Sequence, residues 1–204
     1  MHYGTSDRAI GSLPLVVVIT RIANVLFYKG ELKLNTSISK DSPRTRISVS
    51  ELTKTSLVAA VYVAVTVLFS VISFGAVQLR LSEMFNYLAL YNKRYVVAVT
   101  MGVILANFMS PTWVLDVPIG GISTFLVLIL CRAITKKIKN DILKMVITAL
   151  IFAISMFTVA GQLTILYDLP FWPTWFTVGI GELLSMIVGG ITIYLLNKRI
   201  DLSK

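Results

Sequence analysis

Residues on which many catalytic and metal sites depend are scarce in this chain of 204 residues. It has one cysteine, Cys131, and one histidine, His2. A single cysteine excludes an intrachain disulfide, and these two residues alone cannot form a zinc site of the Cys/His type. Cys131 lies in an apolar run without a histidine base, which favours a packing role over thiol catalysis. No G-x-x-x-x-G-K-[ST] or H-E-x-x-H motif occurs, so no ATPase, metal or other catalytic site is predicted.

Charge is also scarce. Charged residues make up 14% of the chain and hydrophobic residues 56%, whereas soluble domains carry about 25% charged residues. Several apolar runs are long enough to cross a hydrocarbon core of about 30 Å. The sequence therefore predicts an all-α integral membrane protein, folded as a compact helical bundle. The net charge of +9 comes from basic residues in short connections, which suits topology and lipid headgroups rather than nucleic acid.

Six transmembrane helices are predicted within a membrane domain of residues 51–204. The second is short, with ten residues or roughly 15 Å as an α-helix. The predicted spans are Leu52–Phe74 with Gly75 as its stop signal, Ser82–Tyr91, Tyr95–Met109, Asp116–Ala133, Ile142–Leu166 and Trp175–Leu196.

The basic residues orient these spans. Short loops rich in Lys and Arg stay in the cytoplasm, and six spans leave only Arg80 on the outer side. If the second segment did not cross, the basic cluster from Arg132 to Lys144 would lie outside. Both ends of the domain are therefore predicted to be cytoplasmic. The inner side receives Lys40, Arg44, Arg46, Lys54, Lys93, Arg94, Arg132, Lys136, Lys137, Lys139, Lys144, Lys198, Arg199 and Lys204.

Residues 1–50 differ from the rest of the chain. Leu13–Tyr28 is apolar but short for a span and contains Arg21, and a polar stretch with Pro43 follows it. This extension is interpreted as a flexible segment with a weak interfacial helix, an uncleaved signal-like segment, or a product of a wrongly assigned start. No A-x-A cleavage site follows the apolar run.

Polar side chains gather in the outer halves of the predicted spans. Ionisable groups within a membrane are costly and usually face a protein interior or a wet cavity. Ser155, Thr158 and Gln162 recur at helical spacing and so share one face, as do Gly179 and Glu182. We expect one outward-facing substrate site formed by Gln78, Arg80, Glu83, Asn107, Asp116, Gln162 and Glu182.

Several of these residues also have a purely structural interpretation. Asp116 is predicted either to cap a helix, with Pro118 in the first turn, or to bind ligand. Arg80 and Glu83 are expected to form an ion pair at i, i+3, and Gln162 could only bridge helices. Glu182 lies about 10 Å deep, and a carboxylate there needs a partner, a proton or a ligand.

Small residues follow one ridge of the first predicted span. Ser56, Ala60 and Ala64 are four residues apart, and small side chains let another membrane helix come close. The ridge either packs within this chain or docks a partner subunit.

The motifs follow one another in the order of a known family. Ile72-Ser-Phe-Gly75, Gln78-x-Arg80-x-Ser-Glu83, Asp116-Val-Pro-Ile-Gly-Gly and Gly179-x-Gly-Glu182 resemble the QueT family, substrate-binding S components of energy-coupling-factor (ECF) importers. The resemblance covers about Leu52 to Leu196. Gln162 stands where it implies a carboxylate.

The resemblance implies a multi-pass protein of a prokaryotic plasma membrane, with six helices and a pocket open to the outside. It implies a small-molecule substrate, a queuosine precursor such as 7-aminomethyl-7-deazaguanine. It also implies partners, a membrane coupling protein that docks on the Ala60 to Ala64 ridge and two ATPase subunits. A deazaguanine presents amide and amine edges, which Glu, Asp, Asn and Gln side chains bind well.

Two other classes of function stay open. An ion-coupled secondary transporter acting alone would often contain internal repeats, and no clear repeat is visible. A non-transporting structural or assembly subunit would not need Glu182 at depth.

Overall fold

The computed structural model describes residues 49–74, 78–200 and 202. The chain divides into two units, Met1–Arg46 and Ile47–Lys204, and every described residue belongs to the second. The expectations for the N-terminal extension therefore lie outside the described residues, except at Val49 and Ser50. The predicted stop at Gly75 also lies outside them.

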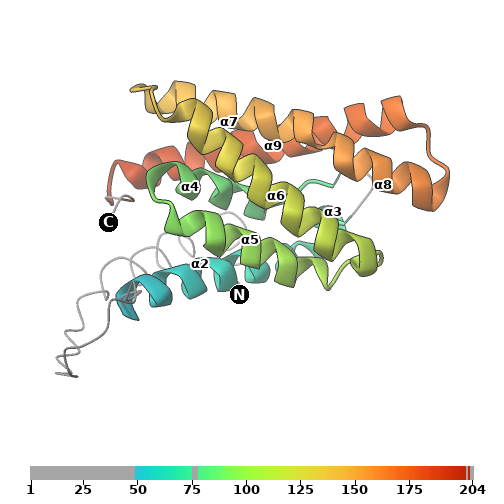
Figure 1. Cartoon of the computed structure of the whole chain (residues 1–204), viewed down its shortest axis with the longest axis horizontal. Coiled ribbons are helices and arrows are strands. Elements are labelled where there is room, and N and C mark those ends of the chain that lie inside the picture. The colour runs from blue at the N-terminus through green and yellow to red at the C-terminus, as the bar shows by residue number, and fades with distance from the viewer. Residues whose placement is uncertain (1–48, 75–77, 201, 203–204) are drawn as a thin grey trace, which may run out of the picture. The chain divides into compact units, whose positions relative to one another are not determined.

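The second unit is a bundle of helices, and the described residues contain no strand (Figure 1). Four helical stretches are long and apolar enough to cross a membrane, namely α2, α6, α7 together with α8, and α9, while α5 is a shorter apolar helix. The elements are α2 (Val49–Leu68), α3 (Ser70–Ser73), η2 (Leu81–Tyr87), α4 (Leu88–Tyr91), α5 (Arg94–Asn107), α6 (Trp113–Thr135), α7 (Asp141–Ser155), α8 (Phe157–Tyr167) and α9 (Phe171–Asn197).

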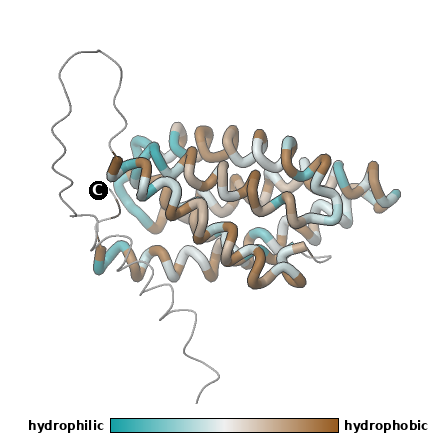
Figure 2. Tube along the Cα trace, turned by 90° about the horizontal axis from the view of Figure 1, so that it is seen from below, coloured by the Kyte–Doolittle hydropathy of each residue, from teal (hydrophilic) through white to brown (hydrophobic). Residues whose placement is uncertain are grey.

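The outward faces of these helices are apolar. Large hydrophobic side chains such as Val71, Ile165 and Phe176 are more than two-thirds exposed, and hydrophobic residues run along the helices (Figure 2). An apolar surface of this extent is unfavourable in water and suits contact with lipid.

The short second segment is not the α-helix that the sequence predicts. Residues Leu81–Tyr87 form the 3₁₀ helix η2, and only Leu88–Tyr91 is α-helical. A 3₁₀ helix rises about 2 Å per residue, so η2 and α4 together extend roughly 20 Å rather than 15 Å. The segment packs among α2, α5, α6 and α9, and Ser82 to Ala89 are all buried.

Two glycines allow close packing, one between α5 and α2 and the other between α9 and η2. A Cβ added at Gly102 of α5 would lie 2.8 Å from Tyr62 Cβ and Cγ of α2, and one at Gly189 of α9 would collide with Met84 of η2. Gly189 therefore serves the packing of α9 against η2.

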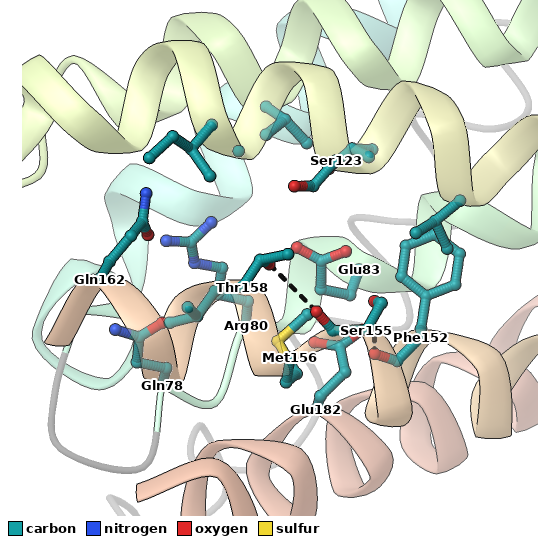
Figure 3. Close-up of a pocket in the computed structure, with 16 residues that line it drawn as sticks. Gln78, Arg80, Glu83, Ser123, Phe152, Ser155, Met156, Thr158, Gln162 and Glu182 are labelled. Carbon is teal, nitrogen blue, oxygen red and sulfur yellow. Dashed lines mark hydrogen bonds between the residues drawn. The ribbon is translucent and has the colours of Figure 1, made fainter. Parts of the chain in front are cut away.

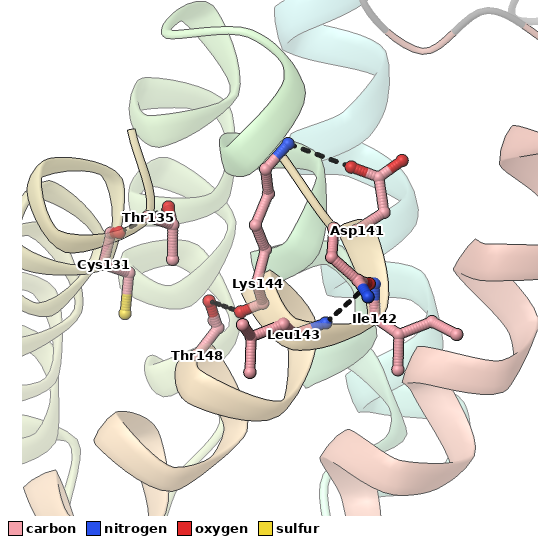
Figure 4. A network of polar contacts seen from close by, with 8 residues as sticks. Cys131, Thr135, Asp141, Ile142, Leu143, Lys144 and Thr148 are labelled. Atoms are coloured by element: carbon pink, nitrogen blue, oxygen red, sulfur yellow. Dashed lines mark hydrogen bonds and ion pairs between the residues drawn. The ribbon is translucent and has the colours of Figure 1, made fainter. Parts of the chain in front are cut away.

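The predicted fifth span is broken into α7 and α8. The Asn140 side chain caps the start of α7 by accepting from the backbone N–H groups of Ile142 and Leu143, at 2.9 and 3.2 Å. Figure 4 shows Asp141 to Lys144 at this end of the helix, with the ion pair between Lys144 and Asp141. At the break, the Ser155 hydroxyl donates to Phe152 O (2.7 Å) and the Trp175 indole donates to Ile154 O (3.1 Å). These side chains supply additional hydrogen-bond donors to carbonyl groups next to the break.

Candidate functional site

A small cavity lies inside the bundle, where the loop before η2 and helices η2, α5, α6, α7, α8 and α9 meet (Figure 3). Its volume is about 50 Å³, which is room for a few water molecules. Small-molecule sites usually measure about 300–1,000 Å³, so a heterocyclic ligand would need the wall to move. The predicted residues at its wall are Gln78, Arg80, Glu83, Gln162 and Glu182.

Glu83 of η2 is held by two protein donors. The Tyr62 hydroxyl of α2 donates to Glu83 Oε1 at 2.7 Å, and the Asn86 amide donates to Glu83 Oε2. Residues at i and i+3 of a 3₁₀ helix eclipse one another, which places Asn86 beside Glu83. Both donors are fully buried. Tyr62 has no signal in the sequence because it lies in an apolar span, whereas the i, i+3 spacing of Glu83 and Asn86 could have indicated their contact.

Glu182 of α9 lines the same cavity but lacks the protein donors that Glu83 has. Its side chain is buried, and Glu182 Oε1 has no hydrogen-bond partner among the described residues. A buried carboxylate oxygen without a donor is unfavourable. The two carboxylates thus come from separate helices and meet at one hollow, but only Glu182 has an oxygen still to be satisfied.

Arg80 does not form the predicted ion pair with Glu83. Its Nη1 donates to Asn107 Oδ1 (3.1 Å) and its Nε to Ser73 O (3.3 Å), and its guanidinium lies 5.0 Å from the centre of the Phe74 ring. Arg80 has an extended backbone immediately before η2. The i, i+3 expectation fails because it assumes that both residues belong to one helix.

Asn107 and Asp116 are not at the wall of this cavity. Both ends of the Asn107 amide are engaged, because its Nδ2 also donates to Asp116 O at 2.7 Å. A Cβ at Gly120 would collide with that amide nitrogen, so a larger residue there would displace the Asn107 side chain from its hydrogen bonds. Asn107 thereby joins Arg80 to the start of α6.

The interpretation of Asp116 as a helix cap is wrong. Helix α6 begins at Trp113, so Asp116 is its fourth residue and Pro118 lies beyond the first turn. The Asp116 carboxylate accepts instead from the hydroxyls of Thr112 (2.6 Å) and Ser110. It holds the loop between α5 and α6.

The two glutamines lie at the cavity wall. Gln162 of α8 donates from Nε2 to Leu115 O of α6 at 3.3 Å, so it bridges helices and also lines the cavity. Ser155 and Thr158 share this wall, as their spacing predicts. Gln78 has a φ of 50°, a left-handed conformation that is uncommon for residues other than glycine. In the view of Figure 3, Arg80 lies between the two glutamines and the two glutamates.

Comparisons with known proteins support the expected family. The sequence model of the QueT transporter family matches residues 52–198. The queuosine precursor transporter QueT of Lactococcus lactis subsp. cremoris (strain MG1363) is 40% identical over 158 residues, which is 73% of this chain and 93% of that protein. No solved structure gives a significant match.

The chain belongs to the QueT transporter family. With four helices long and apolar enough to cross a bilayer, this QueT family member is a multi-pass membrane protein. The family match starts at residue 52, shortly after the start of α2 at Val49.

One further feature of this QueT family member lies on α2. Ser56, Ala60 and Ala64 are exposed, whereas the opposite face of the helix buries Val58, Tyr62 and other residues. The small-residue ridge is therefore not used for packing within the described part of the chain.

Proposed function

We propose that this protein is the substrate-binding S component of an ECF importer and that its substrate is a queuosine precursor. The name of the Lactococcus relative supports this substrate class. The observation that carries the proposal is the pair of buried carboxylates at one cavity, with Glu182 Oε1 lacking a donor. In 7-aminomethyl-7-deazaguanine, the N–H groups of the base and the cationic aminomethyl group are suitable donors.

We further propose six spans with both ends of the membrane domain in the cytoplasm. The second span is η2 with α4, the third is α5, and α7 with α8 form the fifth. Arg80 then lies on the outer side, while the basic residues of the other connections lie in the cytoplasm. A segment as short as η2 and α4 is tolerated at membrane depth because protein surrounds it. The membrane would be the plasma membrane of a prokaryote.

The partners proposed are a membrane coupling protein and two ATPase subunits. This chain has no ATPase motif, so it is proposed to be a non-enzymatic subunit that depends on partners for energy. The exposed ridge of Ser56, Ala60 and Ala64 supports docking of a coupling-protein helix, because small side chains permit close contact between helices.

The site assignment is tested by calorimetric titration of purified protein with 7-aminomethyl-7-deazaguanine. In Glu182→Gln the amide keeps the shape of the side chain but loses its charge. A hydrogen bond to a charged group contributes about 1.5–3 kcal/mol, so the affinity should fall roughly 10- to 150-fold. The matched control is Glu51→Gln, which removes an exposed acid from the first turn of α2.

An unchanged affinity in Glu182→Gln would reject Glu182 as a binding residue. No binding by the wild-type protein would reject this substrate. Uptake by vesicles that contain only this chain would reject the need for ATPase partners and would favour a secondary transporter.

A further inference from the structure

A second and larger cavity lies near the ends of the helices that are outer in the proposed topology. Its volume is about 490 Å³, compared with about 50 Å³ for the inner cavity. We call it the vestibule. Its lining residues include Phe74, Gln78, Thr112, Tyr167, Thr174 and Thr177, which come from the end of the first span, from the loop before η2, from the loop between α5 and α6, and from α8 and α9.

The vestibule and the inner cavity meet at Gln78, which lines both. As it stands, the inner cavity is too small for a bicyclic base, whereas the vestibule falls within the size range of small-molecule sites. A ligand that arrives from this side can therefore be accommodated in the vestibule before the inner wall has moved.

The chemistry of the vestibule differs from that of the inner cavity. None of its described lining residues is charged, whereas the inner cavity has two carboxylates and Arg80. Tyr167 is 53% exposed and offers a ring for stacking. The hydroxyls of Thr112 and Thr177 donate to Asp116 and Pro173 O, so their oxygens can still accept from a ligand N–H.

We infer that the vestibule is a separate, weaker binding site that holds an uncharged planar heteroaromatic group before the ligand moves past Gln78. The inference rests on the proposed function for the identity of the ligand. The vestibule would bind the ring through Tyr167 and the threonine hydroxyls, and the inner cavity would bind the cationic group through Glu182.

The test uses 7-deazaguanine, the base without the aminomethyl group, and the Glu182→Gln protein, in which inner binding is weakened. Titration is followed by tryptophan fluorescence, since Trp172 and Trp175 lie near Tyr167 in sequence at the start of α9. Weak, saturable binding is expected. Adding Tyr167→Leu should weaken it about tenfold, because an aromatic stacking contact is lost.

The matched control is Phe176→Leu, which changes an aromatic side chain of α9 that is 72% exposed and does not line the vestibule. It should leave 7-deazaguanine binding unchanged. Thr177→Val provides a second variant in the vestibule wall. Thermal unfolding in detergent checks that each variant is folded. Absence of saturable binding, or equal affinities in the Tyr167→Leu, Thr177→Val and control proteins, would overturn the inference.

A failure of the vestibule inference can be distinguished from a failure of the proposed function. If wild-type protein binds no aminomethyl compound but Tyr167 still determines 7-deazaguanine affinity, the vestibule stands and the substrate is wrong. Suppose instead that the aminomethyl compound binds tightly in a single kinetic phase whose rate rises linearly with its concentration, and that Tyr167→Leu leaves the association rate unchanged. The vestibule is then rejected as a binding site, and the inner site stands.

Discussion

Replacing Tyr62 by phenylalanine tests whether Glu83 is held in place as a charged group. Tyr62 is fully buried and its hydroxyl donates to Glu83 Oε1 at 2.7 Å. Tyr62→Phe removes that donor and leaves the ring. A hydrogen bond to a charged group contributes about 1.5–3 kcal/mol, which corresponds to a decrease in Tm of roughly 3–12 °C for a chain of this size.

Tyr87→Phe is the matched comparison. Tyr87 is also buried, but its hydroxyl donates to a neutral acceptor, Met186 O, at 3.0 Å. Loss of a neutral hydrogen bond costs about 0.5–1.5 kcal/mol. Thermal unfolding in detergent should therefore show a decrease in Tm about twice as large for Tyr62→Phe as for Tyr87→Phe.

A double-mutant cycle with Glu83→Gln completes the test. If Tyr62 acts through the Glu83 carboxylate, the two substitutions together should cost less than their sum by about 1 kcal/mol. Strict additivity, or a smaller loss for Tyr62→Phe than for Tyr87→Phe, would refute the argument that Tyr62 stabilises a charged Glu83.

Three other substitutions follow from the packing. Gly189→Ala should destabilise the protein by about 1–3 kcal/mol because the new methyl group collides with Met84, whereas Gly161→Ala, which has open space, should preserve or raise Tm. Asn107→Leu removes the link between Arg80 and Asp116 O, so both Tm and affinity for 7-aminomethyl-7-deazaguanine should fall by calorimetry; an unchanged affinity would show that Arg80 needs no such support. Ala60→Leu should leave ligand affinity unchanged but abolish co-purification with the coupling protein, with Val71→Leu as the exposed apolar control; retained co-purification would exclude the ridge as the docking surface.

The inward-facing residues of the long helices could be predicted from the sequence because helical spacing is regular. Ser155, Thr158 and Gln162 are predicted on one face, and they line one cavity. The break between α7 and α8 leaves them on the same wall. Glu182 was identified for a different reason, since a carboxylate far from either end of an apolar helix is costly unless it faces a site.

Expectations from the sequence are wrong where contacts between segments decide the structure. The pairing of Arg80 with Glu83 assumed local helical geometry, but Arg80 is extended and Asn107 from α5 binds it. Asp116 was placed at a helix start, but α6 begins three residues earlier and the carboxylate binds the preceding loop. Tyr62 has no local signal, because its role depends on η2 packing against α2.

The unequal surroundings of the two glutamates indicate what kind of ligand completes the inner cavity. Glu83 has a protein donor at each oxygen, so its charge is stabilised without a ligand. Glu182 lacks a donor at Oε1, and Arg80, the basic residue at the wall, is directed to Asn107 and Ser73 O. A neutral N–H donor would supply the missing hydrogen bond. It would not balance the charge of two acidic side chains that face one arginine, because Arg80 already binds Asn107 and Ser73 O. Under the function proposed above, a ligand that brings both an N–H donor and a positive charge would satisfy the hydrogen bond and balance the charge, so a cationic amine would be a better partner for Glu182 than a neutral base alone.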